Sequence, residues 1–132
     1  MAWINAPKST KGLFGFVYII TNKTNGRKYI GKKFFHTTIK HKPLKGKKNR
    51  RIEVVDSDWK DYWGSSKELN LDIATLGTSS FTREIIKCLK TRWECAYIEA
   101  KLQFENDVLL KNEYYNGIIR IRLPKGPMEL RK

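Results

Sequence analysis

The sequence predicts a small α+β domain, in which a three-stranded, mainly antiparallel sheet is flanked by helices. Three observations lead to this prediction: an apolar stretch with a tight-turn signal near the N-terminus, two later helix-start patterns, and a β-rich segment between those patterns. The chain of 132 residues is long enough for one core but too short for two ordinary domains. Residues 1–132 are therefore expected to form a single domain.

The first two strands are expected to form a β-hairpin. Residues 14–21 (FGFVYIIT) are apolar, and aromatic side chains occupy every second position in their first half. The Asn25-Gly26 pair follows, and both residues tolerate the positive φ angles of a tight hairpin turn. Residues 27–31 (RKYIG) then supply the returning strand.

Two segments carry helix-start signals. Residues 65–68 (SSKE) fit a capping box, in which a serine side chain and a glutamate carboxylate bond exposed amides, and Gly77 marks the expected end of this helix. Residues 91–94 (TRWE) fit a second capping box, which opens a longer helix to about residue 110. The buried stripe of this second helix is expected to be Trp93, Tyr97, Ala100, Phe104 and Val108.

The segment FTREIIKCL between the helices is expected to be the third strand. Phe81, Ile85 and Leu89 are expected to share one of its faces. After the second helix, the chain is expected to turn at Asn116-Gly117 and to end in a short strand.

The net charge of +14 is concentrated in the first two-fifths of the chain. Residues 1–52 hold 14 lysines and arginines and no acidic residue, whereas residues 53–132 hold 13 of each sign. Clustered lysine and arginine side chains contact phosphates, so nucleic acid is the main expected partner. From charge alone, a membrane surface or an acidic protein is the alternative.

Residues 32–55 form a basic insert, which the sequence leaves open between a basic hairpin and a mobile loop. Seven lysines and arginines lie within residues 40–51, where Pro43 and Gly46 interrupt any regular element. A short helical turn is expected at residues 57–62. The residues expected to bind nucleic acid are Lys33, Lys40, Lys42, Lys45, Lys47, Lys48, Arg50 and Arg51.

Other classes of protein are disfavoured by composition. Hydrophobic residues make up 40% and charged residues 30%, a balance typical of globular proteins. No apolar run approaches the roughly 20 residues that a membrane span needs, so no membrane partner is expected. Residues 1–12 lack the apolar region of a signal peptide, and Cys88 and Cys95 are expected to be reduced thiols of a cytoplasmic protein.

The predicted hairpin carries two short motifs. Residues 16–18 (FVY) are separated by ten residues from residues 29–31 (YIG), and Lys32 follows directly. This arrangement resembles the paired strands that name the GIY-YIG endonuclease family, with Phe16 in place of the first glycine. Two tyrosines on a hairpin would otherwise be read as packing residues.

The resemblance extends to about residue 116. Residues 62–66 (YWGSS) are similar to the Tyr-x-Gly-Ser-Gly segment of free-standing phage members of this family. Glu99 stands where the family has a metal-binding glutamate, and Asn116 stands where an asparagine follows it. The alternatives are that Glu99 is a solvated helical carboxylate and that Asn116 is a turn residue.

The resemblance implies an endonuclease that hydrolyses phosphodiester bonds of double-stranded DNA with one Mg²⁺ (or Mn²⁺) ion, held by Glu99. Tyr18 would orient or deprotonate the water, helped by Tyr29. Nearby lysine and arginine charge would lower the tyrosine pKa from its ordinary value near 10. The expected catalytic residues are Tyr18, Tyr29, Lys32, His36 and Asn116.

One position departs from the family pattern. Many members carry an arginine about ten residues beyond the second tyrosine, where it contacts the scissile phosphate, and Ile39 occupies this position here. The sequence does not indicate which base takes over that role, and the bases nearby are His36, Lys40, His41, Arg50 and Arg51.

Two alternatives remain open. The first is a catalytically inactive nucleic-acid-binding module of the same fold, which the departure at Ile39 favours. The second is a zinc site built from His36, His41, Cys88 and Cys95, although neither pair has a usual zinc-ligand spacing. The oligomeric state, monomer or dimer, is also open. The expected location is the cytoplasm, which is that of the host cell if the chain is encoded by a phage.

Overall fold

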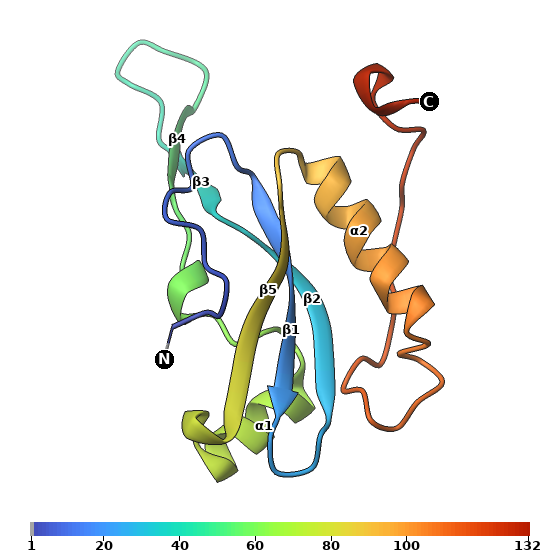
Figure 1. Cartoon of the computed structure of the whole chain (residues 1–132). Coiled ribbons are helices and arrows are strands. Elements are labelled where there is room, and N and C mark those ends of the chain that lie inside the picture. The colour runs from blue at the N-terminus through green and yellow to red at the C-terminus, as the bar shows by residue number, and fades with distance from the viewer. Residues whose placement is uncertain (1) are drawn as a thin grey trace.

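The computed structural model describes residues 2–132 and confirms the predicted α+β fold (Figure 1). A three-stranded antiparallel sheet lies at its centre, and the chain also forms a second, two-stranded sheet that does not pair with the first. No helix in this part of the chain has the length and apolar character needed to cross a membrane. The elements are β1 (Gly15–Asn22), β2 (Lys28–Phe34), β3 (His36–His41), β4 (Arg51–Asp56), η1 (Trp59–Asp61), α1 (Lys67–Leu76), η2 (Thr78–Ser80), β5 (Phe81–Leu89), α2 (Arg92–Glu105) and η3 (Met128–Leu130).

The predicted hairpin is β1 and β2. Its turn closes through a hydrogen bond from the Gly26 amide to the Asn22 carbonyl at 2.8 Å, and Gly26 has a φ of +75°, which glycine adopts without strain. The strands pair in a register that sets Tyr18 opposite Gly31. β2 continues to Phe34, beyond the expected end of the strand, and it is an edge strand because the sheet order is β2-β1-β5.

The third strand, β5, has its predicted bounds but not its predicted face. Its pairing with β1 shifts register between Val17 and Tyr18. An irregularity of this kind breaks the alternation of side chains between the two faces of a strand. Phe81 and Ile85 therefore lie in one core, whereas Leu89 lies in the other. The expectation that all three share a face was wrong.

The two cores lie on opposite faces of the central sheet. The N-terminal segment, η1 and α1 cover one face, and α2 covers the other. The first core comprises Trp3, Phe16, Tyr18, Ile20, Phe35, Trp59, Leu69, Phe81, Ile85 and Tyr115. The second core comprises Val17, Ile30, Leu89, Cys95, Val108 and Tyr114.

Helix α1 begins one residue later than the capping box predicted. The Ser66 hydroxyl, not that of Ser65, accepts a hydrogen bond from the Leu69 amide at 3.3 Å. Glu68 is not part of a capping box, because its carboxylate pairs with Arg27 at 2.6 Å. The C-terminal end agrees with the prediction, since Gly77 has a φ of +87°.

Helix α2 begins where predicted and ends early. The Thr91 hydroxyl accepts from the Glu94 amide at 3.1 Å and donates to the Glu94 carboxylate at 2.9 Å. The helix stops at Glu105 rather than near residue 110.

The buried side of α2 differs from the predicted aromatic stripe. Cys95, Ala100 and Gln103 are its buried residues, whereas Tyr97 is 44% and Phe104 is 59% exposed. The prediction was right for Ala100 and Val108, which are buried, and wrong for Tyr97 and Phe104, because it assigned the largest apolar side chains to the core. The sheet instead accepts a small thiol, a methyl group and an amide, which let the helix approach closely.

The C-terminal segment contains no strand between residues 115 and 127, so the predicted short strand was wrong. Tyr114 makes an isolated parallel bridge to Lys28. The chain then runs back along α2, where the Trp93 indole donates to the Pro124 carbonyl at 3.0 Å (Figure 1).

Candidate active site

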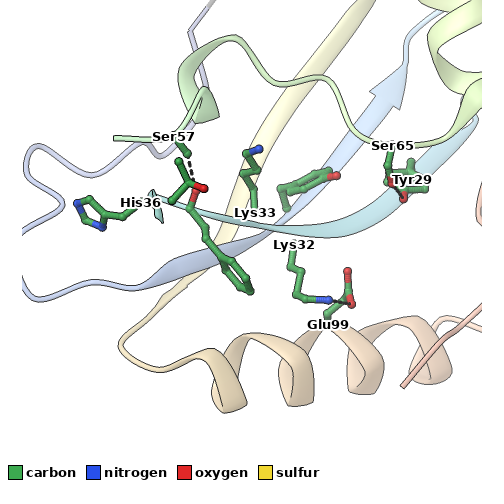
Figure 2. Close-up of a pocket in the computed structure, with 10 residues that line it drawn as sticks. Tyr29, Lys32, Lys33, His36, Ser57, Ser65 and Glu99 are labelled. Atoms are coloured by element: carbon green, nitrogen blue, oxygen red, sulfur yellow. Dashed lines mark hydrogen bonds and ion pairs between the residues drawn. The ribbon is translucent and has the colours of Figure 1, made fainter. Parts of the chain in front are cut away.

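A pocket of about 280 Å³ lies along the edge strand β2, between α2 and the segments that flank η1 (Figure 2). It brings together four of the five predicted catalytic residues with the predicted metal ligand, although they come from β1, β2, β3 and α2. Asn116 is the exception. The lining residues are Tyr18, Tyr29, Lys32, Lys33, Phe34, His36, Thr37, Ser57, Ser65 and Glu99.

The two tyrosines reach the pocket because Gly31 leaves room for them. A Cβ atom at Gly31 would lie 2.5 Å from the Tyr18 hydroxyl oxygen and 3.0 Å from the Tyr29 ring. The two tyrosine rings are 6.2 Å apart between centroids. The Tyr29 hydroxyl forms a hydrogen bond with the Ser65 hydroxyl at 3.1 Å, and this bond fixes the side of the pocket next to α1.

Both tyrosines are harder to ionise than free tyrosine. Burial raises the pKa of Tyr18 well above its ordinary value, and the phenols of Tyr29 and Tyr62 and the Glu99 carboxylate add to this shift. Burial also raises the pKa of Tyr29, against the opposing effect of its hydrogen bond with Ser65. The expectation that basic charge lowers the tyrosine pKa was therefore wrong, and both phenols are protonated at neutral pH.

The stability of the protein should fall at alkaline pH. Because the pKa of Tyr18 is raised in the folded state, the unfolded chain loses this proton first, from about pH 10 upward, and unfolding becomes easier. In the wild type, the free energy of unfolding should decrease as the pH rises through this range. We expect Tyr18→Phe to make that decrease smaller by up to about 1.4 kcal/mol per pH unit. Urea denaturation between pH 9 and pH 11 measures this slope. The matched control is Tyr97→Phe, on the exposed side of α2, and equal slopes in the two variants would contradict the assignment.

Lys32 and Glu99 form an ion pair inside the pocket. The Lys32 ammonium lies 3.1 Å from the Glu99 Oε1 atom, and the Glu99 side chain is only 16% exposed (Figure 2). Lys32 lies opposite Val17 in the strand register and so faces α2. Glu99 is thus a largely buried carboxylate with a cationic partner, not the solvated helical carboxylate of the alternative reading.

Lys33 points to the opposite face of β2. Its ammonium lies 2.6 Å from the Asp58 carboxylate and 4.1 Å from the centre of the Tyr62 ring. This hydrogen bond with Lys33 lowers the pKa of Asp58. The edge strand therefore presents one lysine on each face, and each lysine is paired with a carboxylate.

His36 lies at the far end of the pocket from Tyr29 and Ser65 (Figure 2). Its Nε2 atom is 3.6 Å from the Asp56 carboxylate. Ile39, at the position of the family arginine, is 43% exposed on β3 and does not line the pocket. Of the bases considered as substitutes for that arginine, only His36 lines the pocket.

Asn116 braces β2 from outside the pocket. Its side-chain oxygen accepts from the Ile30 amide at 3.0 Å, and its side-chain nitrogen donates to the Ile30 carbonyl at 2.8 Å. The Gln103 side chain donates to the same carbonyl at 3.0 Å. Asn116 is 8% exposed and thus acts on the pocket through the backbone that precedes Gly31, rather than as the turn residue of the alternative reading.

Arg83 is a buried residue that the sequence analysis missed. It is 3% exposed, and its guanidinium lies 4.5 Å from the Trp3 ring centre and 4.2 Å from that of Trp63. It donates to the carbonyls of Lys60 and Tyr62 at 3.1 and 2.8 Å, and burial lowers its pKa. Arg83 thereby anchors the segment that brings Ser65 to the pocket. The sequence does contain a signal for this burial. Arg83 lies on the apolar face of a predicted strand, and the chain has four tryptophans whose rings an arginine can contact.

The donor atoms of the pocket suit a hydrated magnesium ion. Glu99 is the one carboxylate among the described lining residues, and Mg²⁺ commonly binds through one or two carboxylates while it keeps several waters. Within residues 2–132, no group of three or more His, Cys, Asp or Glu side chains is placed to hold a metal. The zinc alternative built from His36, His41, Cys88 and Cys95 therefore has no support.

The basic insert forms a hairpin rather than an irregular loop. We call residues 36–56 the ribbon, comprising β3, β4 and the loop between them. All the predicted nucleic-acid-binding residues except Lys33, which lines the pocket, lie on this ribbon, where they are exposed: Lys40, Lys42, Lys45, Lys47, Lys48, Arg50 and Arg51.

Comparisons with known proteins agree with this geometry. A family model described as "Putative endonuclease segE, GIY-YIG domain" matches residues 3–119. A relative from Enterobacteria phage T4, named "Putative endonuclease segE", is 32% identical over 105 residues, which cover 79% of this chain and 40% of the relative. The chain thus matches about two-fifths of that relative's length. No solved structure matches the chain. The two motif strands, the pocket that they line and the match to the family model together show that the chain belongs to the GIY-YIG endonuclease family.

Proposed function

We propose that the protein hydrolyses phosphodiester bonds of double-stranded DNA in the pocket on β2, with one Mg²⁺ or Mn²⁺ ion bound at Glu99. One observation supports this proposal above the others. Tyr18, Tyr29, Lys32 and Glu99 converge on one pocket from three separate elements, and packing of the two cores does not require the charged pair of Lys32 and Glu99.

Lys32 and Glu99 have complementary tasks in this proposal. The Lys32 ammonium is paired with Glu99 and can turn to a phosphate oxygen, because both groups line the same open pocket. Glu99 then needs another cation, since an unpaired, largely buried carboxylate is costly. When bound, the metal ion would stabilise the negative charge that develops on the phosphate oxygens.

Tyr18 and Tyr29 act as neutral phenols. Because burial raises the pKa of both residues, their hydroxyl groups keep their protons and orient the attacking water by hydrogen bonds. Ser65 holds Tyr29 in place for this task. Lys33 and His36 lie further along β2 and β3 and would contact phosphates next to the scissile one.

The DNA is expected to run from the pocket onto the ribbon. The exposed lysines and arginines of the ribbon continue the basic lining of the pocket, and phosphate contacts make binding weaken as salt rises. There is one such pocket in the described chain, so a double-strand break needs two chains or two binding events. With a relative encoded by a bacteriophage, we expect the protein to act on DNA in the cytoplasm of a host cell.

A second candidate function is DNA binding without cleavage. The observation that favours it is Ile39, which places an apolar side chain on the ribbon where family members carry an arginine. Among the described residues that line the pocket there is no arginine.

Incubation with supercoiled plasmid tests the proposal. We expect nicked or linear product with Mg²⁺ or Mn²⁺, and none with EDTA, because Glu99 is expected to need a divalent cation for the reaction. The measurement is an agarose gel of the product over time. Intact plasmid in the presence of either metal, together with a salt-sensitive mobility shift, would establish the binding function instead.

A further inference from the structure

The ribbon stands apart from the rest of the molecule. β3 and β4 pair only with each other and form a sheet separate from the central one. Figure 1 shows the ribbon and its loop projecting from the end of the central sheet that is opposite α1. Neither core contains a residue of β3 or β4, so the ribbon is not needed to form the cores.

The two faces of the ribbon carry different side chains. Opposite residues of an antiparallel pair lie on the same face, and faces alternate along each strand, so the register assigns every side chain. We name the faces after one residue of each. The Ile52 face comprises His36, Thr38, Lys40, Ile52, Val54 and Asp56, and the Ile39 face comprises Thr37, Ile39, His41, Arg51, Glu53 and Val55.

The base of the Ile52 face holds the pair of His36 and Asp56, and beyond this pair the face is apolar and basic, without an acidic residue. Ile52 is 64% and Val54 is 66% exposed, and Lys40 lies opposite Ile52. Glu53, whose carboxylate is 2.7 Å from the His41 ring, lies on the other face. Exposed β-branched side chains beside a lysine suit the major groove, where thymine methyl groups offer apolar contacts and base edges accept hydrogen bonds. A carboxylate such as that of Glu53 would be repelled by phosphates.

We infer that the ribbon enters the major groove of the bound duplex with its Ile52 face against the base edges. This inference rests on the proposed function for its DNA partner. The major groove is about 12 Å wide and admits a two-stranded β-ribbon. The exposed lysines and arginines of residues 42–50 then meet phosphates at the far end of the ribbon.

The pocket and the Ile52 face are continuous. His36 lines the pocket and lies two residues before Thr38, on the same face of β3, and Thr37 of the Ile39 face lines the pocket as well. Six residues of strand span about 20 Å. At 3.4 Å per base pair, the ribbon therefore contacts bases up to about six pairs to one side of the scissile phosphate.

Two matched variants test which face meets the DNA. Ile52→Glu and Ile39→Glu add the same charge at neighbouring, exposed positions on opposite faces. We expect Ile52→Glu to weaken binding to a fluorescent duplex by about tenfold or more, and Ile39→Glu by no more than about threefold. Anisotropy titrations in EDTA measure binding without cleavage, and circular dichroism checks that both variants fold. Equal losses in the two variants would overturn the inference, because the ribbon would then supply charge alone.

Modified DNA tests which groove is used. A duplex with bulky substituents at thymine C5 fills the major groove, and we expect it to bind the wild-type protein weakly and to abolish the difference between the two variants. Netropsin, which fills the minor groove of unmodified DNA, should not compete. Competition by netropsin, or equal binding of the modified duplex, would contradict the major-groove assignment. Tighter binding to single-stranded DNA than to duplex would contradict it as well.

The outcomes for the ribbon and for catalysis are separable. A protein that shows the difference between the Ile52 and Ile39 variants but never cuts plasmid would refute the proposed hydrolysis and keep the ribbon assignment. A protein that cuts plasmid while both variants bind equally would refute the ribbon assignment alone.

Discussion

Glu99→Gln is expected to reduce plasmid cleavage by about a thousandfold or more while DNA binding remains. The glutamine amide has nearly the shape of the carboxylate, and its oxygen can still accept a hydrogen bond from Lys32, so the fold around α2 should persist. The glutamine side chain lacks the negative charge that the proposed divalent cation needs. The rate of nicking in Mg²⁺ and the affinity for a duplex in EDTA together measure the two effects.

The same helix provides a matched control. Glu105 lies on α2, outside the pocket, with a half-exposed side chain whose carboxylate is 4.0 Å from the Lys101 ammonium. Glu105→Gln makes the same chemical change and should leave both nicking and binding close to wild type. Equal cleavage by the two variants would show that Glu99 holds no essential ion. Loss of binding in Glu99→Gln alone would assign the residue to the DNA interface instead.

Gly31→Ala is expected to abolish the proposed cleavage and to destabilise the fold by about 1–3 kcal/mol. The added methyl group would lie 2.5 Å from the Tyr18 hydroxyl oxygen and 2.7 Å from the ring carbon that bears it. Tyr18 is 1% exposed and cannot move away without disturbing the first core. The cost is steric, because Gly31 has an ordinary strand conformation that alanine also adopts. Thermal or urea denaturation gives the stability, and plasmid nicking gives the activity.

Gly117→Ala is the control for this substitution. A Cβ atom at Gly117 would meet nothing within 4 Å, and its φ is not positive. We expect this variant to unfold and to cut like the wild type. If Gly31→Ala kept full activity, the close packing of Tyr18 against Gly31 would have no role in placing the hydroxyl.

Local signals in the sequence were sufficient for the outline of the fold. The Asn25-Gly26 turn, the Thr91 cap and the Gly77 stop each depend on residues close together in the chain, and the structure has all three. The motif tyrosines and Glu99 were predicted from the family resemblance, and they do meet in one pocket.

Features set by packing between distant segments were not predictable in this way. The face of Leu89 depends on an irregularity in the pairing of two strands, which leaves no local sequence signal. The pKa of Tyr18 was expected to fall because of nearby basic residues in the sequence, but its burial in the fold raises it. The role of Arg83 likewise depends on Trp3 and Trp63, which reach it from distant parts of the sequence.

The way in which the chain covers its own edge strand has a consequence for solubility. An open strand edge invites pairing with another chain, and proteins prevent this by covering the edge or by placing lysine on it. The residues before and after Tyr114 bond to Lys28, and Asn116 bonds to Ile30, so the first half of β2 is covered. Beyond it lie Lys32 and Lys33, whose charges resist the addition of a foreign strand. The lysines proposed to hold DNA therefore also protect the protein from edge-to-edge aggregation.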